Sequence, residues 1–372
     1  MIDAHDLAYL DMAEALAVRA LGATRPNPHV GAVVVKNGAV VGTGYHEAAG
    51  KPHAEIIALR EAGKKARGAT LYLSLEPCVH WGRTPPCAEA VLASGVGRVV
   101  VAGLDPNPRI HGRGTRNLRR AGLPVEIDDR PERKSGLNEM HAKYIVDRRP
   151  FVTLKTALSL DGKLATRTGE ARWISSEPAR DYAHFLRAEN DAVLVGVNTI
   201  KADDPLLSVR PPNRPGKTIL RVVLDPDLRL PAGARLLADS PGGPVLVYAR
   251  AAADSADAAR AERKNRLVER GAEVAEIPAD GAGLDLRLVL SDLARREIAG
   301  VLVEGGGRTV SGFLTAGLVD KVIFIYAPLL IGGPGAVGLW EGAGTSRLAD
   351  APRFSRLKAF RLGGDLVVEG YF

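Results

Sequence analysis

Both cysteines of this 372-residue chain stand beside prolines and follow a His-x-Glu motif, a combination that constrains the fold more than any other feature. His53-Ala54-Glu55 begins a predicted helix, Cys78 follows Pro77 at the end of a predicted strand, and Cys87 begins the next predicted helix. One imidazole and two thiolates supply three of the four ligands of tetrahedral zinc, and a fourth position left to water is typical of catalytic sites. The fold must therefore bring three separate segments together around one ion.

Glu55 is the residue of this motif that remains available for proton transfer. It follows His53 by two positions and can move protons without binding the metal. Zinc lowers the pKa of a bound water toward about 7, and the start of a helix stabilises the thiolate of Cys87. We therefore predict that His53, Cys78 and Cys87 bind Zn²⁺ and that Glu55 is the general acid/base.

Apolar periodicity predicts an α/β chain of two domains, because strand and helix patterns alternate throughout. A polar stretch at 128–135 and a basic segment at 147–150 separate the domains, which we place at 1–147 and 148–372. In the first domain the pattern predicts helices over 5–22, 53–66, 86–94 and 114–121, and strands over 30–35, 40–45, 70–75, 96–102 and 125–127. In the second it predicts strands over 151–157, 192–197, 219–224, 244–248, 300–303 and 319–326, and helices over 177–189, 258–271, 285–296 and 308–316.

Composition and charge narrow the setting. Two cysteines are too few for a disulfide-stapled secreted fold, the N-terminal residues lack signal-peptide features, and no apolar run approaches the roughly 20 residues that span a bilayer. We therefore expect a cytoplasmic protein that does not act at a membrane. The net charge is +7, and the scattered basic residues favour a small phosphorylated ligand over nucleic acid.

A longer series of motifs runs through the first domain. It comprises Pro26-Asn27-Pro28-x-Val30-Gly31, Gly44-Tyr45-His46, Pro52-His53-Ala54-Glu55, Glu76-Pro77-Cys78-x-His80-x-Gly82-Arg83-Thr84-Pro85-Pro86-Cys87 and Asp105-Pro106-Asn107-Pro108. His-x-Glu followed by Pro-Cys and a second cysteine marks zinc-dependent nucleobase deaminases, although eight residues here separate the cysteines instead of the usual two. The series resembles the deaminase half of RibD, the family of bifunctional riboflavin biosynthesis proteins.

The resemblance implies a cytidine-deaminase-like three-layer fold for the first domain. It also implies that substrate is held by Asn27, His46, His80, Arg83 and Thr84. Two positions depart from the residues that are common in the family: His29 stands where asparagine is common, and Trp81 where histidine or another aromatic is usual.

A glycine-rich turn in the second domain, Val303-Glu304-Gly305-Gly306-Gly307-Arg308-Thr309, links a predicted strand to a helix and can bind phosphate through backbone amides. Three motifs precede it: Leu154-Lys155-x-Ala157-x-Ser159-Leu160-Asp161-Gly162-Lys163, Gly169-Glu170-x-x-Trp173-Ile174-Ser175 and Ala202-Asp203-Asp204-Pro205-x-Leu207-x-x-Arg210. Together they are similar to the reductase half of the same family, which implies a dihydrofolate-reductase-like fold that uses NADPH.

The same resemblance assigns residues to the reductase site. The cofactor positions are Ala157, Trp173, Thr199, Asp203, Gly306, Gly307, Arg308, Thr309, Val310, Ser311 and Gly312. The substrate positions are Ala171, Ser175, Arg187, Leu207, Arg210 and Glu304. Ala171 stands where serine is common. The sequence does not identify the proton donor of the reduction, and Asp203, a water molecule and Glu304 stay open for this role.

The resemblance implies two successive reactions on a small phosphorylated pyrimidine. Zinc-dependent deamination converts 2,5-diamino-6-(5-phosphoribosylamino)pyrimidin-4-one to 5-amino-6-(5-phosphoribosylamino)uracil, and NADPH then reduces the ribosyl to the ribityl side chain. We also expect a homo-oligomer, either a dimer or a tetramer. Two alternatives stay open: a nucleic-acid base deaminase whose second domain only binds, and a non-catalytic protein whose structural zinc site is closed by His80.

Overall fold

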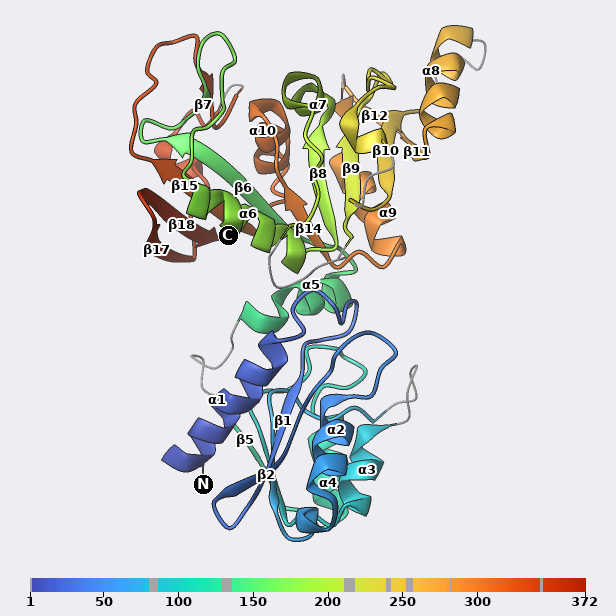
Figure 1. Ribbon diagram of the computed structural model, residues 1–372, viewed down its shortest axis with the longest axis vertical. Helices are drawn as coiled ribbons and strands as arrows, with labels where there is room; N and C mark the ends of the chain where they lie inside the picture. Colours follow the sequence, from blue (N-terminus) through green and yellow to red (C-terminus); the bar gives the residue numbers. More distant parts are fainter. Residues whose placement is uncertain are drawn as a thin grey trace. The chain divides into compact units, whose positions relative to one another are not determined.

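The computed structural model describes residues 2–79, 86–128, 136–210, 218–238, 242–251, 257–281, 283–341 and 344–372. The chain divides into two compact units, Met1–Arg148 and Arg149–Phe372 (Figure 1). The boundary expected from the sequence, between 147 and 148, lies one residue before this division. No helix in the described part of the chain is long and apolar enough to span a membrane.

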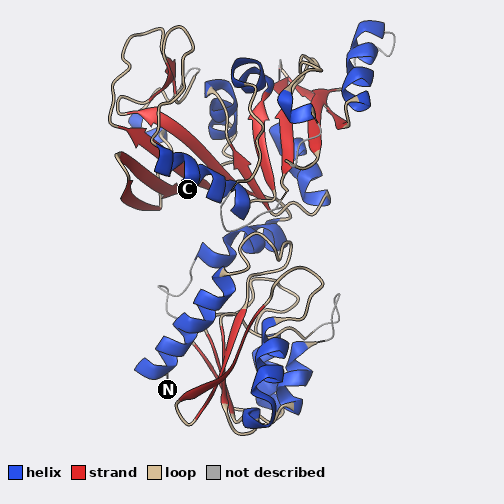
Figure 2. Cartoon of the chain, in the orientation of Figure 1, coloured by secondary structure: helices blue, strands red, loops and turns tan. Residues whose placement is uncertain are grey.

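Unit 1 is built on a five-stranded sheet with the order β2-β1-β3-β4-β5 (Figure 2). β1 is antiparallel to both β2 and β3, whereas β3, β4 and β5 are parallel. The strands are β1 (Gly31–Lys36), β2 (Ala39–Tyr45), β3 (Thr70–Leu73), β4 (Arg98–Val101) and β5 (Val125–Ile127). The helices are α1 (Ala4–Val18), α2 (Ala54–Ala62), α3 (Cys87–Ala93), α4 (Arg113–Arg120) and α5 (Glu139–Asp147), with short 3₁₀ turns η1 (Gly63–Ala66) and η3 (Gly136–Asn138).

Strand β1 supplies apolar side chains to both faces of this sheet, because neighbouring residues of a strand point to opposite sides. Ala32 and Val34 pack with buried residues of α2, α3 and α4, and Val33 and Val35 pack with buried residues of α1. α1 approaches so closely that a Cβ atom on Gly31 would lie 1.9 Å from the carbonyl oxygen of Ala13. The result is a three-layer unit with helices on both faces of the sheet.

A buried carboxylate ties α1 to this sheet. Both terminal nitrogens of Arg98 donate to Asp6 at 2.8 Å, and the Tyr72 hydroxyl donates to it at 2.7 Å. Although burial disfavours the charged form, Arg98 and Tyr72 lower the pKa of Asp6 to about 2. Because the pKa is lower in the folded state, this stabilisation is complete above the ordinary pKa of 3.8 and is lost as the pH falls toward 2.

We therefore expect Asp6→Asn to destabilise unit 1 by about 2–3 kcal/mol at neutral pH, because it removes charge-assisted hydrogen bonds. Hydrogen exchange of the β1 and β3 amides measures this loss, and the amides of unit 2 serve as the control. The variant should also lose less stability than the unmodified protein between pH 5 and 2. Unchanged protection of β1 and β3 would contradict this role for Asp6.

Unit 2 is built on a nine-stranded sheet with the order β11-β10-β9-β8-β14-β6-β15-β18-β17. In this order, every neighbouring pair from β11 to β15 is parallel, whereas the pairs β15–β18 and β18–β17 are antiparallel. The strands of the sheet are β6 (Phe151–Ser159), β8 (Ala192–Gly196), β9 (Leu220–Leu224), β10 (Val245–Arg250), β11 (Ala272–Ile277), β14 (Gly300–Val303), β15 (Lys321–Ala327), β17 (Arg356–Leu362) and β18 (Asp365–Tyr371).

Helices cover both faces of this sheet, and short strand pairs lie outside it. The helices are α6 (Glu177–Glu189), α7 (Val197–Asp203), α8 (Ala258–Glu269), α9 (Leu286–Arg295) and α10 (Gly307–Thr315), with 3₁₀ turns η4 (Arg235–Leu237) and η5 (Leu348–Asp350). The separate pairs are β7 (Lys163–Ala165) with β16 (Val337–Gly338), and β12 (Ala279–Asp280) with β13 (Gly283–Leu284). Residues of α9 and α10 pack in the largest core cluster, whereas α6 packs against Leu302, Ile323 and Ile325 in a separate one.

The structure departs from the predicted elements in several places. Helices α5 and α7 and strands β11, β17 and β18 were not predicted. β17 is mostly exposed along its length, so it lacks the alternation of apolar and polar residues that identifies a half-buried strand. α5 lacks a broad apolar face, and only His141 within it is buried.

Candidate functional site

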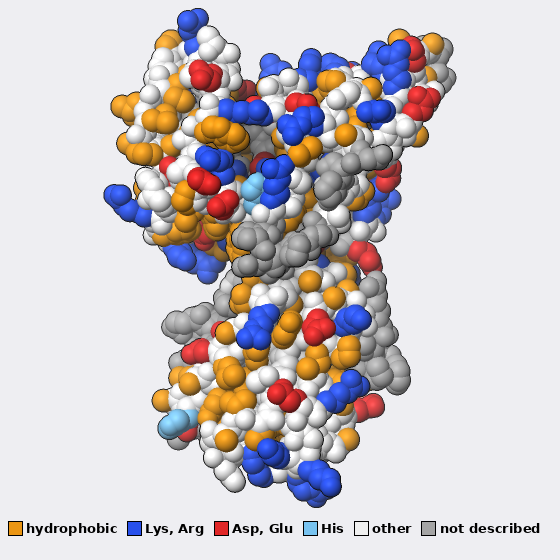
Figure 3. Space-filling view, in the orientation of Figure 1, with side chains coloured by type: hydrophobic (Ala, Val, Ile, Leu, Met, Phe, Trp, Pro, Cys, Tyr) orange, Lys and Arg blue, Asp and Glu red, His pale blue; other side chains and the backbone are white. Residues whose placement is uncertain are grey.

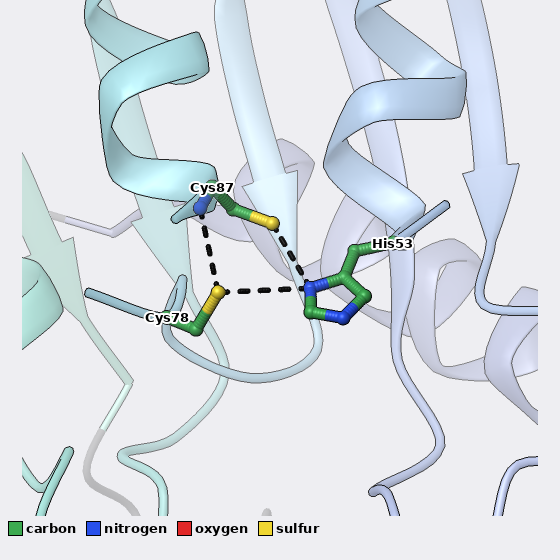
Figure 4. A group of neighbouring side chains, drawn as sticks. All are labelled: His53, Cys78 and Cys87. Carbon is green, nitrogen blue, oxygen red and sulfur yellow. Dashed lines mark hydrogen bonds between the residues drawn. The ribbon is translucent and has the colours of Figure 1, made fainter. Parts of the chain in front are cut away.

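Three short segments of unit 1 meet at the predicted zinc ligands. His53 is the residue that caps the start of α2, Cys78 follows β3, and Cys87 is the first residue of α3. Their ligand atoms lie within 4.8 Å of one another. The Nδ1 atom of His53 is 3.0 Å from the Cys87 sulfur and 3.6 Å from the Cys78 sulfur (Figure 4).

The donor set fits zinc. One imidazole nitrogen and two sulfurs that face a common point are the ligands zinc prefers, and three protein ligands leave one position for water. The pKa of Cys78 is lowered to about 4 by the hydrogen bond with Cys87 and by His53. The backbone N–H of Cys87, at the start of α3, also donates to the Cys78 sulfur at 3.3 Å. Cys78 therefore favours the thiolate form that binds metal. The hydrogen bond with Cys78, burial and the charge of Glu55 instead raise the pKa of Cys87, against the expectation from its position at a helix start.

Glu55 lies beside this cluster in the first turn of α2 and is 3% exposed. Burial, together with the negative charge of Cys78, raises the pKa of its carboxyl to about 7. A carboxyl in this state can both accept and deliver a proton near neutral pH.

Asn27 and His46 form a second side of this site. His46 Nδ1 donates to the carbonyl oxygen of Pro52 at 3.1 Å, so its Nε2 accepts from the Asn27 side-chain amide at 3.3 Å. The His46 ring also meets the His53 ring edge-on, with 5.0 Å between centroids. The structure therefore places Asn27 and His46 beside the zinc ligand His53. His80, Arg83 and Thr84, together with Trp81, lie outside the described residues.

A cavity of about 490 Å³ opens between α2 and α3 beside the zinc ligands. It is lined by Pro52, His53, Ile56, Leu59, Arg60, Pro86, Cys87 and Ala90.

Glu76 shapes the segment that carries Cys78, a role that sequence reasoning missed. Its buried carboxylate accepts backbone N–H groups from Asp105 at 3.0 Å, Gly112 at 2.6 Å and Gly114 at 3.1 Å. A Cβ atom on Gly114 would lie 2.1 Å from the carbonyl oxygen of Pro77. The carboxylate thus fixes the start of α4 against the residues just before Cys78.

Unit 2 contains a larger cavity of about 720 Å³, and most of the residues predicted for the reductase site line it. On the face seen in Figure 3, Lys and Arg side chains gather around a hollow between α6 and α7. Of the predicted positions, the cavity is lined by Ala157, Ala171, Trp173, Ser175, Arg187, Thr199, Asp203, Leu207, Arg210, Glu304 and Gly306. Gly307, Arg308, Thr309, Val310, Ser311 and Gly312 belong to α10 and are not among its lining residues.

Three largely buried charged side chains line this cavity and contact one another: Lys155, Arg187 and Glu304. Glu304 accepts two hydrogen bonds from Arg187, at 2.7 and 2.8 Å, and its carboxylate lies 3.9 Å from the Lys155 ammonium. Although burial disfavours its charge, Arg187 and Lys155 lower the pKa of Glu304 to about 2. Burial lowers the pKa of Lys155, an effect that Glu304 opposes.

Lys155 and His184 line the same cavity but were not assigned from the sequence. A lysine within the otherwise buried strand β6 was the signal for Lys155, because such a charge needs a partner. His184 Nδ1 donates to the Ser208 carbonyl oxygen at 3.2 Å. The same oxygen accepts a hydrogen bond from Arg187, also at 3.2 Å. Nothing in the sequence around His184 pointed to this contact.

The first turn of α10 has the features of a phosphate-binding turn. Gly306 precedes the helix, and its N–H donates to the Thr199 hydroxyl at 3.3 Å. A Cβ atom on Gly305 would lie 2.8 Å from Cβ of Thr309, so a side chain there would crowd the turn. Trp173, which also lines the cavity, is 71% exposed, and the Arg180 guanidinium lies 4.7 Å from the centre of its ring. A helix start, a small-residue turn and an open aromatic face suit a dinucleotide such as NADPH.

Comparison with known proteins gives matches over both units. The family model described as "RibD C-terminal domain" matches residues 150–368, and the model described as "Cytidine and deoxycytidylate deaminase zinc-binding region" matches residues 3–103. The riboflavin biosynthesis protein RibD of Aquifex aeolicus is 44% identical over 369 residues, covering 99% of each chain. That of Escherichia coli is 39% identical over 360 residues, covering 96% of this chain and 97% of its own.

Solved structures agree in both sequence and fold. Acinetobacter baumannii RibD superimposes with a TM-score of 0.85 at 37% identity, covering 99% of this chain and 98% of its own. A Thermotoga maritima protein, described as a diaminohydroxyphosphoribosylaminopyrimidine deaminase and 5-amino-6-(5-phosphoribosylamino)uracil reductase, gives a TM-score of 0.84 at 33% identity, with the same coverage. The expected fold, a deaminase-like unit followed by a dihydrofolate-reductase-like unit, is confirmed.

Proposed function

Because the chain belongs to the RibD family, whose members are bifunctional deaminases and reductases of riboflavin biosynthesis, we propose that its two reactions are carried by the zinc cluster of unit 1 and the large cavity of unit 2. The protein is an enzyme that joins a hydrolase and an oxidoreductase. The observation that carries the proposal is the convergence of His53, Cys78 and Cys87 beside the buried Glu55, in a chain that matches the family over its whole length.

The deaminase occupies residues 1–147 and acts on 2,5-diamino-6-(5-phosphoribosylamino)pyrimidin-4-one. His53, Cys78 and Cys87 hold zinc, which when bound supplies an activated water. Glu55 would move two protons in turn: the first from the attacking water to the ring nitrogen, and the second from the hydroxyl group that the water adds to the ring to the departing amino group, which leaves as ammonia. Asn27 and His46 orient the pyrimidine ring, and His80, Arg83 and Thr84 complete the substrate contacts.

The reductase occupies residues 148–372 and acts on 5-amino-6-(5-phosphoribosylamino)uracil. NADPH, when bound, supplies the hydride. The proposed cofactor contacts are Ala157, Trp173, Thr199, Asp203 and Gly306, which line the cavity, and residues 307–312 of the adjoining α10. The proposed substrate contacts, which also line the cavity, are Ala171, Ser175, Arg187, Leu207, Arg210 and Glu304. Most of the rate enhancement comes from holding the cofactor and the sugar carbon in contact.

Lys155 is the group we assign as proton donor of the reductase. Its side chain lines the cavity and lies 3.9 Å from Glu304, and burial lowers the pKa of the ammonium, which makes proton release easier. Arg187 already pairs with Glu304, so Arg210 is the better placed of the two arginines to hold the substrate phosphate.

The two alternatives fit the molecule less well. A nucleic-acid deaminase with a non-catalytic second domain does not account for a reductase-family match over residues 150–368. A non-catalytic protein whose zinc site is closed by His80 does not account for a match, over 99% of each chain, to a riboflavin biosynthesis protein RibD.

Metal removal tests whether unit 1 carries out the deamination and unit 2 the reduction. Given the diaminopyrimidine and NADPH, the enzyme should release ammonia first and then oxidise NADPH. Chelation of the metal should abolish ammonia release yet leave reduction of supplied 5-amino-6-(5-phosphoribosylamino)uracil unchanged, and added Zn²⁺ should restore the first reaction. Full ammonia release from metal-free protein would refute the zinc mechanism.

We also propose that the protein is a homo-oligomer, a dimer or tetramer, and that it acts in the cytoplasm. Two free thiols that bind metal need a reducing compartment, which supports the second statement. Light scattering measures the oligomeric mass, and a monomeric mass would contradict the first.

A further inference from the structure

The last segment of unit 1, η3 and α5 over residues 136–147, follows the final strand of the sheet and lies outside both matched family models. Those models end at residue 103 and begin again at residue 150. The five strands and the helices α1 to α4 form the layered core without this segment. Hydrogen bonds from two of its residues, Asn138 and His141, reach one turn of unit 1, at 24–29.

Asn138 holds the end of this turn through two backbone hydrogen bonds. Its side-chain amide donates to the His29 carbonyl oxygen at 3.0 Å, and its side-chain oxygen accepts the His29 backbone N–H at 2.7 Å. The backbone N–H and carbonyl groups of His29 are therefore both hydrogen-bonded to Asn138, which lies 109 positions later in the chain.

His141 holds the other side of the same turn. It is buried, and its Nδ1 atom donates to the carbonyl oxygen of Pro26 at 2.8 Å. Its Nε2 atom lies 3.7 Å from the carboxylate of Asp105. Since Pro26 immediately precedes Asn27, this hydrogen bond restrains the peptide group from which Asn27 extends.

Asn27 connects the turn to the zinc ligands. Its own backbone N–H donates to the Thr24 carbonyl oxygen at 2.9 Å, and the Thr24 hydroxyl donates to the Asn27 carbonyl oxygen at 3.1 Å. Its side-chain amide donates to His46, whose ring packs against His53. A shift of the turn would therefore move the Asn27 amide relative to the metal site.

We propose that Asn138 and His141 are positioning residues of the deaminase, which clamp the turn 24–29 so that the Asn27 amide faces the substrate. This inference rests on the proposed function, because it assumes that Asn27 contacts the substrate.

The test compares His141→Leu with His141→Asn in the full-length, zinc-loaded enzyme. Leucine removes the donor to Pro26, whereas the amide nitrogen of asparagine can take the place of Nδ1. We expect His141→Leu to raise the KM of deamination about fivefold to tenfold, as loss of one buried hydrogen bond does, with kcat within about twofold. His141→Asn should recover most of the affinity. Val146→Ala, at a 53% exposed position of the same helix, is the matched control.

A double-variant cycle shows whether His141 acts through Asn27. In an Asn27→Ala background, His141→Leu should change the KM of deamination by less than about twofold, whereas independent effects that simply multiply would overturn the proposal. Zinc content and the kinetics of the reductase should match those of the unmodified protein in each variant. Equal losses in both reactions, or loss of zinc, would identify a role in folding and overturn the positioning role.

The two levels of the proposal fail in different ways. Absence of ammonia release by the unmodified zinc enzyme would refute the proposed function itself. Normal ammonia release combined with an unchanged KM in His141→Leu would overturn only the clamp. Asn138→Asp supplies a second measurement. An aspartate carboxylate cannot donate to the His29 carbonyl oxygen, so this variant should also raise the KM of deamination.

Discussion

Replacement of Glu55 by glutamine should lower kcat of deamination by about 10² to 10⁴-fold while the protein keeps its zinc. The carboxyl lies in the first turn of α2, two residues after the ligand His53, and is almost completely buried. Glutamine has nearly the same shape, so the packing around it is preserved, but its amide neither takes up a proton from water nor gives one to ammonia. The loss therefore reports proton transfer and not a change of fold.

Three measurements isolate this effect. Ammonia release under saturating substrate gives kcat, elemental analysis gives the zinc content, and reduction of supplied 5-amino-6-(5-phosphoribosylamino)uracil shows that unit 2 is intact. Glu89→Gln, at an exposed position in the first turn of α3, makes the same chemical change without an effect on either reaction. Full deamination by zinc-containing Glu55→Gln would remove Glu55 from the mechanism.

The second large effect is expected for Glu304→Gln in the reductase. Among the described residues, the Glu304 carboxylate is the only one found in ion pairs with both Arg187 and Lys155. All three side chains are largely buried. Removal of one member of a buried ion cluster leaves the other charges without compensation and typically costs about 3–5 kcal/mol. We therefore expect kcat/KM of reduction to fall at least about 10²-fold, with a lower free energy of unfolding for unit 2.

Asp350→Asn is the control for this change. It removes a carboxylate that pairs with Arg347 at an exposed position, where ion pairs contribute about 0–1 kcal/mol. Steady-state oxidation of NADPH measures the reductase, and hydrogen exchange of β6 and β14 measures local stability. Deamination should be unaffected in both variants. Wild-type reduction by Glu304→Gln would show that the buried carboxylate is needed neither for the substrate nor for the cluster.

Much of the deaminase site could be predicted from the sequence because its chemistry is local. His53 and Glu55 share one helix start. Pro86 caps the helix that Cys87 begins, and Cys78 follows Pro77 in the segment after β3. The alternating elements and the glycine-rich turn before α10 are equally local patterns, since they depend on side-chain periodicity and on backbone geometry over a few residues.

Contacts between distant residues could not be predicted in this way. The sequence places Lys155 and Glu304 in separate motifs, and only the parallel pairing of β6 with β14 brings their charges together at the cavity. Glu304 was assigned to substrate by resemblance, whereas the structure shows that its carboxylate first compensates two buried cations.

The sequence by itself therefore predicted the group of His53, Cys78 and Cys87 that the structure brings together, the order of the two domains and the family resemblance, because these depend on residue types at short spacing. Only the tertiary structure decided that α5 reaches back to the turn at 24–29. Asn138 and His29 are 109 positions apart, and His141 and Pro26 are 115 apart. No periodicity records such a pairing, because it depends on how the completed sheet and its helices place the two segments side by side.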